Sequence, residues 1–297
     1  MSDKPITLVI LDTSKTARLS SFDCFTALDA KAGIEQLLTY ERVEPAEVRD
    51  IVHGAIFTRG GTDLQRTAIF VGGNDAARCE AVVAKVADSF FGPFRVSVMS
   101  DPNGSNTTAA AAVRVAEARL GIAGKSVAIL GATGPVGLRA AQLCARDTAE
   151  VVLTSRELAR AQSLAERLSE GEGALAEFVP VQAANTDDYL AACAQSEVII
   201  ACGAAGAELL PKGALDNLPK LRLAIDLNAV PPAGLGFIPS PMTRESHGQV
   251  ELWGAVAVGN YKMKIHKAAI RYLFTANDIV LNTAAIYTIA EGVEIKV

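Results

Sequence analysis

The amino-acid sequence predicts an α/β protein made of two α/β domains with a cleft between them. Three observations predict this fold class. Short apolar segments of strand type alternate with helix-spaced segments along the whole chain. Near residue 130, a strand, a glycine-rich turn and a helix follow one another, and the alternation continues after them. The length of 297 residues is sufficient for two hydrophobic cores.

The first domain is predicted from apolar segments with turn residues at their ends. Residues 6–11, 55–58, 67–71 and 94–99 are short and apolar, as in buried strands. A serine followed by an early acidic residue predicts a helix that begins at Ser20. Helix-spaced apolar residues predict further helices at 44–52, 76–91 and 105–120. This alternation defines an α/β domain over residues 1–120.

Residues 125–145 carry the clearest motif of the chain. Val127–Leu130 is short and apolar and stops at a glycine, which predicts a buried parallel strand. Glycines then recur at three-residue spacing before an alanine- and leucine-rich helix. In a dinucleotide-binding βαβ unit, such a turn lets backbone N–H groups approach a pyrophosphate at the helix N-terminus. The spacing G-x-x-G-x-x-G departs from the usual G-x-G-x-x-G, so the motif alone is less specific. The strand before it and the helix after it support the prediction. The predicted cofactor residues of this turn are Gly131, Thr133, Gly134, Pro135, Val136 and Gly137.

The next strand, Glu150–Thr154, predicts which nicotinamide cofactor binds. An NAD site carries an acidic residue at this strand end, whereas Ser155 and Arg156 stand here. A hydroxyl followed by a guanidinium suits a 2′-phosphate, and Arg160 lies one turn into the next helix. NADP is therefore favoured, and the adjacent Glu157 leaves NAD open. The alternative is that both arginines belong to a solvated helix start.

The rest of the chain continues the second domain, a Rossmann-type unit over residues 121–261. Strands are expected at 178–181, 197–202, 221–227 and 252–258, and amphipathic helices at 262–274 and 278–289. The helices at about 262–297 are expected to pack back across the cleft. Ligands of open α/β sheets bind at the carboxyl ends of the strands. The predicted cofactor site therefore also includes Cys202, Gly203 and Asn228.

Polar loops of the first domain indicate a second ligand-binding face. They are Thr58–Gly61, Val71–Asn74 and Asp101–Thr108, and each is expected to follow a strand. Ordinary turn and cap chemistry is the alternative, because serine and threonine often precede alanine-rich helices. Arg59 favours a functional role, because turn formation alone does not explain an arginine beside two glycines.

A basic run between residues 259 and 267 indicates a further site. Lys262 and His266 are four residues apart and share one helix face. Lysines near a predicted helix start oppose the helix dipole, so a ligand could explain them better than local stability. A solvated basic face, which fits Lys264 better than Lys262, or a buried core histidine are the alternatives. The sequence shows no Ser-His-Asp order, P-loop or metal spacing, which argues against a hydrolase or a kinase.

Composition excludes several other classes. A net charge of −5 argues against general binding to nucleic acid or to an anionic membrane. The first residues do not lead into a signal peptide, and no apolar stretch reaches membrane-spanning length. Five cysteines without C-x-x-C spacing, and only three histidines, argue against a zinc site and for reduced thiols in a cytoplasmic protein.

Several motifs, in one order along nearly the whole chain, carry a family resemblance. They are Phe57–Gly61, Thr67–Gly73, Phe90–Ser97, Asn103–Ala111, Thr133–Gly137 and Lys-x-Lys-x-His at Lys262–His266. In these the sequence resembles the NAD(P)-dependent methylenetetrahydromethanopterin dehydrogenases of methylotrophic bacteria, distant relatives of methylenetetrahydrofolate dehydrogenases. The NADP-specific branch has G-T-G-P-V-G, whereas Ala132 and Thr133 precede Gly134 here. This departure resembles the branch that accepts both cofactors.

The resemblance implies a reaction. Enzymes of this family oxidise the methylene bridge between two pterin nitrogens to a methenyl cation and pass a hydride to C4 of the nicotinamide. The nitrogens stabilise the cation, so the protein orients two rings and excludes water rather than supplying a strong base. By the resemblance, Lys262 faces the pterin together with His266. The remaining implied pterin contacts are Phe22, Asp23, Arg59, Asn103, Ser105, Asn106 and Thr107.

Two other functions remain open from the sequence. One is a methylenetetrahydrofolate dehydrogenase, which the choice of folate or methanopterin carrier would distinguish. The other is a non-catalytic NAD(P)-binding redox sensor, which would bind nucleotide without turnover. The leading prediction is one-carbon oxidation downstream of formaldehyde, by a homo-oligomer for which a trimer or hexamer is possible.

Overall fold

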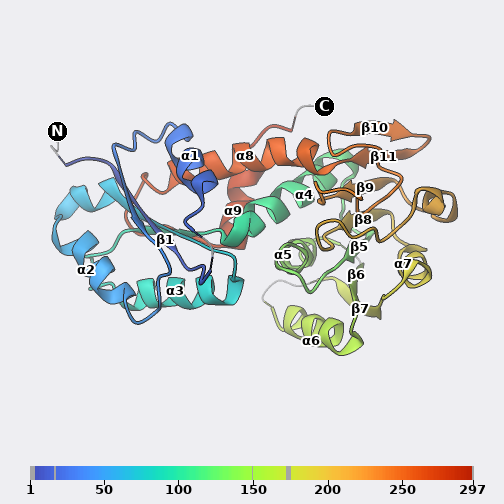
Figure 1. The fold of residues 1–297 in the computed structure, drawn as a ribbon, viewed down its shortest axis with the longest axis horizontal. Coiled ribbons are helices and arrows are strands. Elements are labelled where there is room, and N and C mark those ends of the chain that lie inside the picture. Colours follow the sequence, from blue (N-terminus) through green and yellow to red (C-terminus); the bar gives the residue numbers. More distant parts are fainter. Residues whose placement is uncertain (1–3, 17, 149, 172–174, 296–297) are drawn as a thin grey trace. The chain divides into compact units, whose positions relative to one another are not determined.

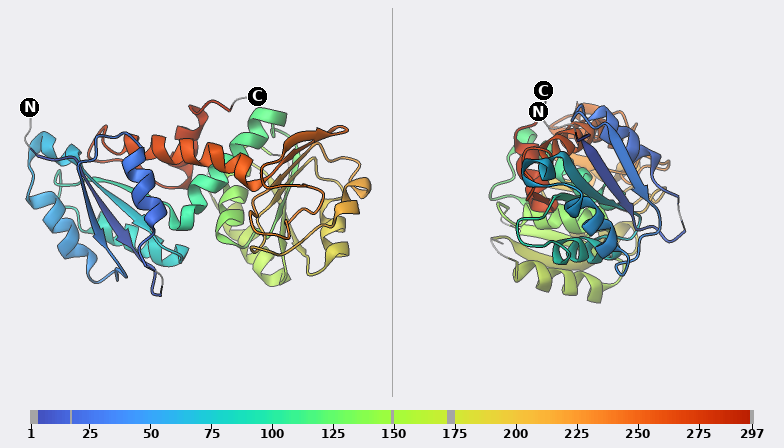
Figure 2. Two further views of the ribbon diagram at one scale, coloured as in Figure 1. Left: turned by 45° about the horizontal axis from the view of Figure 1, so that its top comes forward. Right: turned by 90° about the vertical axis from the view of Figure 1, so that its left-hand side faces the viewer.

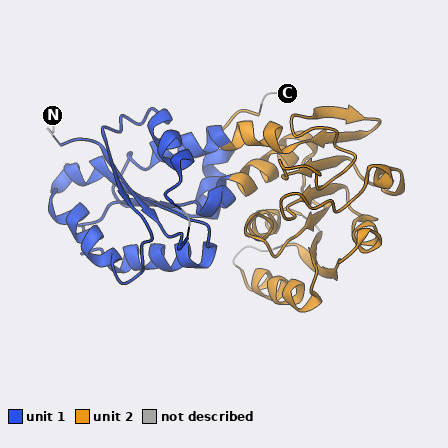
Figure 3. Ribbon diagram, in the orientation of Figure 1, with its two compact units in different colours: residues 1–107, 263–292 blue, residues 108–262, 293–297 orange. Residues whose placement is uncertain are grey.

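The computed structural model describes residues 4–16, 18–148, 150–171 and 175–295. The chain divides into two compact units (Figure 3). Unit 1 comprises residues 1–107 and 263–292, and unit 2 comprises residues 108–262 and 293–297. Two helices, α4 (Ser105–Leu120) and α8 (Ala255–Tyr272), begin in one unit and end in the other.

The described part of unit 1 holds a five-stranded parallel sheet in the order β12-β4-β3-β1-β2. Its strands are β1 (Thr7–Asp12), β2 (Gln36–Tyr40), β3 (Thr67–Gly72), β4 (Ser97–Ser100) and β12 (Val280–Leu281). The central strands β1 and β3 are buried at every position, as expected for a sheet with helices on both faces.

Helices cover both faces of this sheet (Figures 1 and 2). On one face, α2 (Val48–Phe57) and α3 (Ala76–Asp88) pack their valines and isoleucines on alternate residues of β1, β3 and β4. Phe70 of β3 points to the other face, where its ring stacks on His266 of α8. Helices α1 (Ser21–Asp29) and α9 (Thr283–Glu291) complete the unit.

The described part of unit 2 holds a seven-stranded sheet in the order β10-β11-β9-β8-β5-β6-β7. Its strands are β5 (Ser126–Leu130), β6 (Glu150–Ser155), β7 (Glu177–Gln182), β8 (Val198–Ala201), β9 (Leu223–Asp226), β10 (Arg244–His247) and β11 (Val250–Trp253). All neighbours are parallel except β10 and β11. The chain runs from β5 outward through β6 and β7, then crosses to β8 on the other side. The topological switch point therefore lies between β5 and β8.

Helices α5 (Pro135–Cys144), α6 (Leu158–Ser169) and α7 (Thr186–Cys193) connect the strands of unit 2. The predicted α/β class, with parallel strands and a Rossmann-type second unit, is confirmed.

One predicted element is wrong, and two others have different bounds from those expected. Residues 55–58 are not a strand, because Val48, Val52 and Ile56 form one buried helix face and carry α2 to Phe57. The strand expected at 252–258 ends at Trp253, and α8 begins two residues later. The helix expected from Asp278 begins at Thr283, where Asn282 caps it after the short strand β12. Strands β2 and β10 are also present where no element was expected; both are edge strands with mostly exposed residues.

Helix α8 begins earlier than expected, so the lysines of the basic run do not lie near its start. Lys262 lies in the middle of an 18-residue helix rather than near its start. The helix dipole acts within the first and last turns, so it does not oppose Lys262. A different reason is needed for a lysine that is only 9% exposed.

The division between the units falls near residue 107, whereas the sequence placed a domain boundary near residue 120. The difference has a local cause. Helix α4 is continuous, and Arg119 near its end donates to both oxygens of Glu251 at 2.7 and 3.0 Å. This ion pair holds the end of α4 on β11 of unit 2. The predicted cleft between the domains stays a prediction.

No helix in the described ranges is long and apolar enough to span a membrane. The same residues contain no group of three or more His, Cys, Asp and Glu side chains that could hold a metal ion. All five cysteines are described, and no disulfide joins any of them.

Candidate active site

The glycine turn of unit 2 connects β5 to α5 at the switch point. Gly131 has φ +76°, which favours glycine, and a Cβ there would lie 3.0 Å from the carbonyl oxygen of Cys202. A Cβ on Gly137 would overlap the carbonyl oxygen of Gly131. These two glycines therefore allow the turn to pass close to the loop after β8 and to its own helix. Gly134 is the N-cap of α5.

The start of α5 fits the pyrophosphate of a dinucleotide. The first helical hydrogen bond of α5 runs from the N–H of Leu138 to the carbonyl of Gly134 at 2.9 Å. The N–H groups of Val136 and Gly137 precede that bond, and Pro135 at the first helical position has none to satisfy. Donors at a helix N-terminus, beside glycines without side chains, suit a phosphate anion.

The end of β6 places hydroxyl groups beside this turn. Thr154 Oγ1 accepts the N–H of Gly131 at 3.0 Å and donates to the carbonyl of Ile129 at 3.2 Å. Ser155 Oγ lies 3.5 Å from Thr133 Oγ1 and accepts the N–H of Glu157 at 3.3 Å. The sequence did not single out Thr154, because it lies inside the predicted strand. Its hydroxyl joins β6 to the glycine turn.

Arg156 and Arg160 are both exposed, at the start of α6. The carbonyl of Arg156 accepts the side-chain amide of Gln182 at 3.2 Å, which joins this turn to β7. Arg156 directly follows Ser155 at the carboxyl end of β6, and Arg160 lies one turn further along the chain, in α6. This location agrees with the position expected for a group that reads the adenosine ribose.

The loops after β8 and β9 contain the other three predicted cofactor residues. Cys202 donates its backbone N–H to Leu130 at 2.8 Å, and Gly203 follows it beside Gly131. Burial raises the pKa of the Cys202 thiol. The thiol is therefore protonated at neutral pH and is no nucleophile. Cys202 and Gly203 thus bring backbone, rather than reactive groups, to the glycine turn.

Asn228 links several loop segments through its side-chain amide. Its Oδ1 accepts from Val230 at 3.0 Å and from Gly206 at 3.4 Å, while Nδ2 donates to the carbonyl of Pro232 at 3.0 Å. Asp226, which the sequence did not single out, accepts N–H groups of Asn228 and Leu235 at 2.9 and 3.0 Å. Burial raises the pKa of Asp226. These two residues fix the loop that follows β9.

Unit 1 gathers a polar cluster at the carboxyl end of its sheet, and Asp101 is its centre. Asp101 follows β4 and is 0% exposed. Its Oδ1 accepts the N–H groups of Asn106 and Thr107 at 2.8 and 3.1 Å, in the first turn of α4. Its Oδ2 accepts the hydroxyl of Thr107 at 2.6 Å and lies 3.6 Å from Nδ1 of His266.

His266 lies between this carboxylate and two aromatic rings. Its ring stacks on Phe70, with centroids 5.8 Å apart and planes 17° apart, and meets Phe22 at 6.4 Å in a tilted arrangement. Phe22 is 48% exposed and next to Asp23, whose carboxylate lies near Gly72 at the end of β3. A Cβ on Gly72 would lie 2.9 Å from the Phe70 ring, so the strand end requires glycine.

Asn103, Ser105, Asn106 and Thr107 lie in one turn beside Asp101. Asn103 is exposed and has φ 49°, a conformation that asparagine tolerates better than most residues. Ser105, Asn106 and Thr107 are buried, and the side chain of Asn106 donates to the carbonyl of Ser100 at 2.6 Å. The loop thus contains four of the predicted pterin-site residues, and it reaches His266 through Thr107 and Asp101. Asn103 in this loop and Phe22 on α1 are exposed.

Lys262 lies on α8 one turn before His266. Both are buried, at 9% and 1% exposure. Residues four apart in a helix share a face, as the sequence predicted. Lys264 lies between them in the chain and is exposed.

Arg59 does not lie with these residues. Its Nη2 donates to Oγ1 of Thr7 at 3.0 Å, and Thr7 is the first residue of β1. Asp12 and Asp101 lie at the other end of the sheet. The expectation that Arg59 shares the polar face is wrong, because residues 55–58 form the end of α2 rather than a strand.

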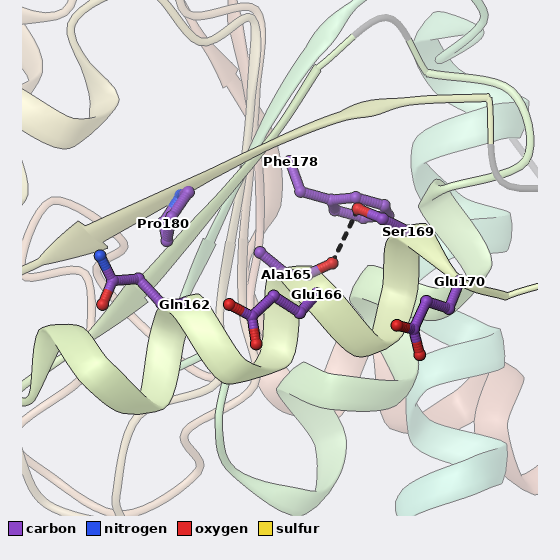
Figure 4. Close-up of a pocket in the computed structure, with 7 residues that line it drawn as sticks. All are labelled: Gln162, Ala165, Glu166, Ser169, Glu170, Phe178 and Pro180. Carbon is purple, nitrogen blue, oxygen red and sulfur yellow. Dashed lines mark hydrogen bonds between the residues drawn. The ribbon is translucent and has the colours of Figure 1, made fainter.

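A separate hollow of about 420 Å³ lies between α6 and β7 (Figure 4). It is lined by residues of α6 from Gln162 to Ser169, by Glu170 just after the helix, and by Phe178 and Pro180 of β7. The hydroxyl of Ser169 donates to the carbonyl of Ala165 at 2.8 Å, and Glu166 and Glu170 bring negative charge. These two carboxylates do not suit an anionic cofactor.

The fold and the glycine turn define unit 2 as a dinucleotide-binding domain of the Rossmann type. The model of the family described as shikimate / quinate 5-dehydrogenase matches residues 114–233. Shikimate 5-dehydrogenase from Listeria monocytogenes has a similar structure, with a TM-score of 0.58 and 16% identity over 97% of both chains. The 5-ketofructose reductase of a Gluconobacter strain has a TM-score of 0.56 and 14% identity, over 98% of this chain and 99% of that chain. These likenesses show the fold.

The sequence relatives define the particular family. The model described as methylene-tetrahydromethanopterin dehydrogenase, N-terminal, matches residues 21–103. The bifunctional protein MdtA of Methylorubrum extorquens is 40% identical, over 94% of this chain and 96% of that protein. The NAD(P)-dependent methylenetetrahydromethanopterin dehydrogenase of the same organism is 33% identical, over 88% and 89%. The chain belongs to the methylenetetrahydromethanopterin dehydrogenase family.

Proposed function

We propose that the protein transfers a hydride from 5,10-methylene-tetrahydromethanopterin to NAD(P)⁺ and forms the 5,10-methenyl cation and NAD(P)H. The observation that carries this proposal is the identity of 33% to a dehydrogenase named for that reaction, over 88% of this chain. The glycine turn of unit 2 and the polar cluster of unit 1 support it. No strong base is required, because the hydride leaves with its electron pair and the bridging nitrogens stabilise the cation.

The cofactor supplies the hydride acceptor when it is bound. The N–H groups at the start of α5 and the glycines at 131, 134 and 137 would hold its pyrophosphate. Ser155 and Arg156 would hold a 2′-phosphate, with Arg160 assisting from the next turn. Glu157 could accept a ribose hydroxyl instead, so both NADP and NAD are accommodated and NADP is favoured.

The pterin would bind to side chains of α1 and α8. Lys262 would orient it through a polar ring atom, and Phe22 would provide an exposed aromatic surface. His266 and Asp23 would contribute polar contacts. Asp101 acts through His266: its carboxylate, fixed by three donated hydrogen bonds, faces Nδ1 of the imidazole and holds the ring in place.

We place the reaction in one-carbon oxidation downstream of formaldehyde, in the cytoplasm of a methylotrophic bacterium, and expect a homo-oligomer. The absence of disulfides among the five described cysteines supports a reducing compartment. Light scattering of the purified protein tests whether it forms a homo-oligomer, such as a trimer or a hexamer.

Steady-state kinetics test the function. The purified protein is assayed with methylene-tetrahydromethanopterin and either NADP or NAD, and separately with methylene-tetrahydrofolate. Turnover of the methanopterin carrier with at least one cofactor is expected. Turnover of only the folate carrier would assign the protein to the folate branch. Nucleotide binding without turnover of either carrier would favour the redox sensor.

A further inference from the structure

We propose that Thr154 is a positioning residue for the dinucleotide. It holds the glycine turn of unit 2 in the conformation that binds the pyrophosphate, and it acts equally on NADP and NAD. This inference rests on the proposed use of NAD(P) and concerns a residue outside the predicted site. Thr154 is the penultimate residue of β6 and is 0% exposed. A side chain without exposed surface contacts no bound cofactor, so its effect on binding passes through its neighbours.

Strand β5 separates from β6 before it separates from β8. On the β6 side, the last register pair is Ile129 with Leu153. On the β8 side, the pairing continues to Leu130, opposite Ala201. The backbone groups of the turn next to β6 therefore need other partners, because buried N–H and carbonyl groups are nearly always hydrogen-bonded. Thr154 directly follows Leu153, at this opening between the strands.

Thr154 supplies these partners with its side chain and its backbone. Its hydroxyl donates to the carbonyl of Ile129 at 3.2 Å and accepts the N–H of Gly131 at 3.0 Å. Its carbonyl accepts the N–H of Ala132 at 3.0 Å. On the other side, the carbonyl of Leu130 accepts a backbone N–H of the loop after β8 at 2.8 Å. The start of the turn is therefore fixed from both neighbouring strands.

The bond between Thr154 and Gly131 bears on the phosphate site because the turn passes directly into α5. The carbonyl of Gly131 accepts the N–H of Gly134 at 3.1 Å, and Gly134 is the N-cap of α5. The N–H groups of Val136 and Gly137 follow in the first turn of that helix. Hydrogen bonds weaken steeply when donor and acceptor are misaligned. A change in the path of the turn would therefore weaken the bonds from these groups to a pyrophosphate.

The two consecutive hydroxyl residues of β6 then have different roles. In the proposed function, Ser155 and Arg156 contact the 2′-phosphate, which only NADP carries. Thr154 acts on the pyrophosphate site, and the pyrophosphate is common to both cofactors. Loss of the Thr154 hydroxyl should therefore weaken both cofactors alike. A purely structural role would lower the stability of unit 2 without changing the affinity of the folded protein.

Calorimetric titration of the purified protein with NADP and with NAD, without a carrier, tests this role. Thr154→Val keeps the shape of the side chain and removes the hydroxyl, so the N–H of Gly131 and the carbonyl of Ile129 lose their partner. We expect Kd for NADP and Kd for NAD to rise by the same factor, about fivefold or more. Thr154→Ser keeps the hydroxyl and should bind within about twofold of wild type. Thr154→Cys, whose thiol is a weak donor and acceptor, should lie between them.

Thr148 provides the matched control. It is 3% exposed, and its hydroxyl donates to the carbonyl of Cys144 at 2.9 Å, beyond the end of α5 that is opposite to the glycine turn. Thr148→Val also removes a buried hydroxyl, so it should lower the unfolding temperature without changing either Kd. Circular dichroism checks that each variant is folded at the temperature of the titration. If Thr154→Val is not folded, the difference between Thr154→Ser and Thr154→Cys gives the same test.

Three results would overturn the proposal. They are unchanged affinity for both cofactors in folded Thr154→Val, a loss for only one of two cofactors that the wild type binds, and an equal loss in Thr148→Val. The titrations require no turnover, so failure of the carrier assay would count against the proposed function and leave the result for Thr154 standing.

Discussion

Asp101 is the residue on which the local order of the unit 1 cluster depends. Its buried carboxylate accepts two backbone N–H groups and one hydroxyl and also faces His266. Removing it would leave those donors buried without an acceptor. We expect Asp101→Ala to lower the free energy of unfolding by about 3 kcal/mol or more, since each of the three donors left without an acceptor costs ~1–3 kcal/mol. Urea denaturation measures this.

The matched control for Asp101 is Asp29. Asp29 forms an ion pair with Lys267 at 3.4 Å, and both side chains reach solvent, with exposures of 65% and 31%. Exposed pairs contribute ~0–1 kcal/mol. Asp29→Ala should therefore change the stability little. Equal losses in the two variants would show that Asp101 has no special structural role.

Lys262 is the residue on which the proposed pterin site depends most. We expect Lys262→Met to lower kcat/KM for methylene-tetrahydromethanopterin about tenfold or more, because a polar contact to the ring is lost while the buried stem is kept. Cofactor binding should be unchanged. Lys264→Met, which alters an exposed lysine two residues away, should retain full activity. Full kcat/KM in Lys262→Met would remove this residue from the pterin site.

Arg156 is the residue on which the predicted preference for NADP depends most. Charge-assisted hydrogen bonds contribute ~1.5–3 kcal/mol, so Arg156→Gln should raise KM for NADP roughly tenfold or more. KM for NAD should change little, because NAD lacks the 2′-phosphate. Arg160→Gln should also raise KM for NADP, but by a smaller factor. Equal losses for both cofactors would assign Arg156 to general folding or binding.

Among elements, the turn between β5 and α5 depends most closely on its sequence. A Cβ on Gly137 would overlap the carbonyl oxygen of Gly131. Gly137→Ala should destabilise unit 2 by about 1–3 kcal/mol, as overpacking does, and weaken NADP binding. Gly213, which has open space around it, is the control, and Gly213→Ala should be tolerated. Thermal unfolding and NADP titration measure both, and a fully stable Gly137→Ala that binds NADP normally would contradict the close packing.

The glycine turn could be predicted because its chemistry is local: the strand, the glycines and the helix adjoin in sequence. The ends of α2 and α8 could not. Ile56 is a β-branched residue beside glycines, so the segment resembles a strand until the burial of Val48 and Val52 defines a helix face. In α8, Ala255 to Gly259 have a strand-like apolar pattern, and only the tertiary fold makes them helical.

The candidate site, too, could be predicted from the sequence only in part. Thr107 and His266 could be selected by residue type, but their common partner Asp101 became evident only when β4, α4 and α8 were placed together. Arg59 was selected correctly as unusual and assigned to the wrong place, because its position follows from the helical state of the preceding residues. Thr154 and Asp226 lie inside predicted strands and carried no signal of their own.

At the scale of the whole molecule, we expect the buried cysteine thiols to be unreactive towards alkylating reagents in the folded protein. Burial raises the pKa of Cys144 and of Cys193 to about 12, because the charged thiolate is disfavoured away from water. At pH 8 only about one such thiol in ten thousand is ionised. Iodoacetamide at pH 8 should therefore leave both residues unlabelled in the native protein and label them after unfolding.

Cys24 provides the internal comparison for that experiment. It is partly exposed, although burial and the neighbouring Asp23 raise its pKa too. Peptide mass spectrometry should find Cys24 labelled first. Labelling of Cys144 or Cys193 at the rate of Cys24 in the folded protein would show that unit 2 opens readily.

The most direct test of the whole account follows the hydride itself. The protein is mixed with methylene-tetrahydromethanopterin in which both hydrogens of the methylene bridge are replaced by deuterium, together with NADP or NAD. The reduced nicotinamide is examined by mass spectrometry and NMR. We expect one deuterium per reduced nicotinamide, at C4, with the methenyl pterin formed in equal amount. Unlabelled reduced nicotinamide, or methenyl pterin formed without any, would contradict direct hydride transfer between the two ligands.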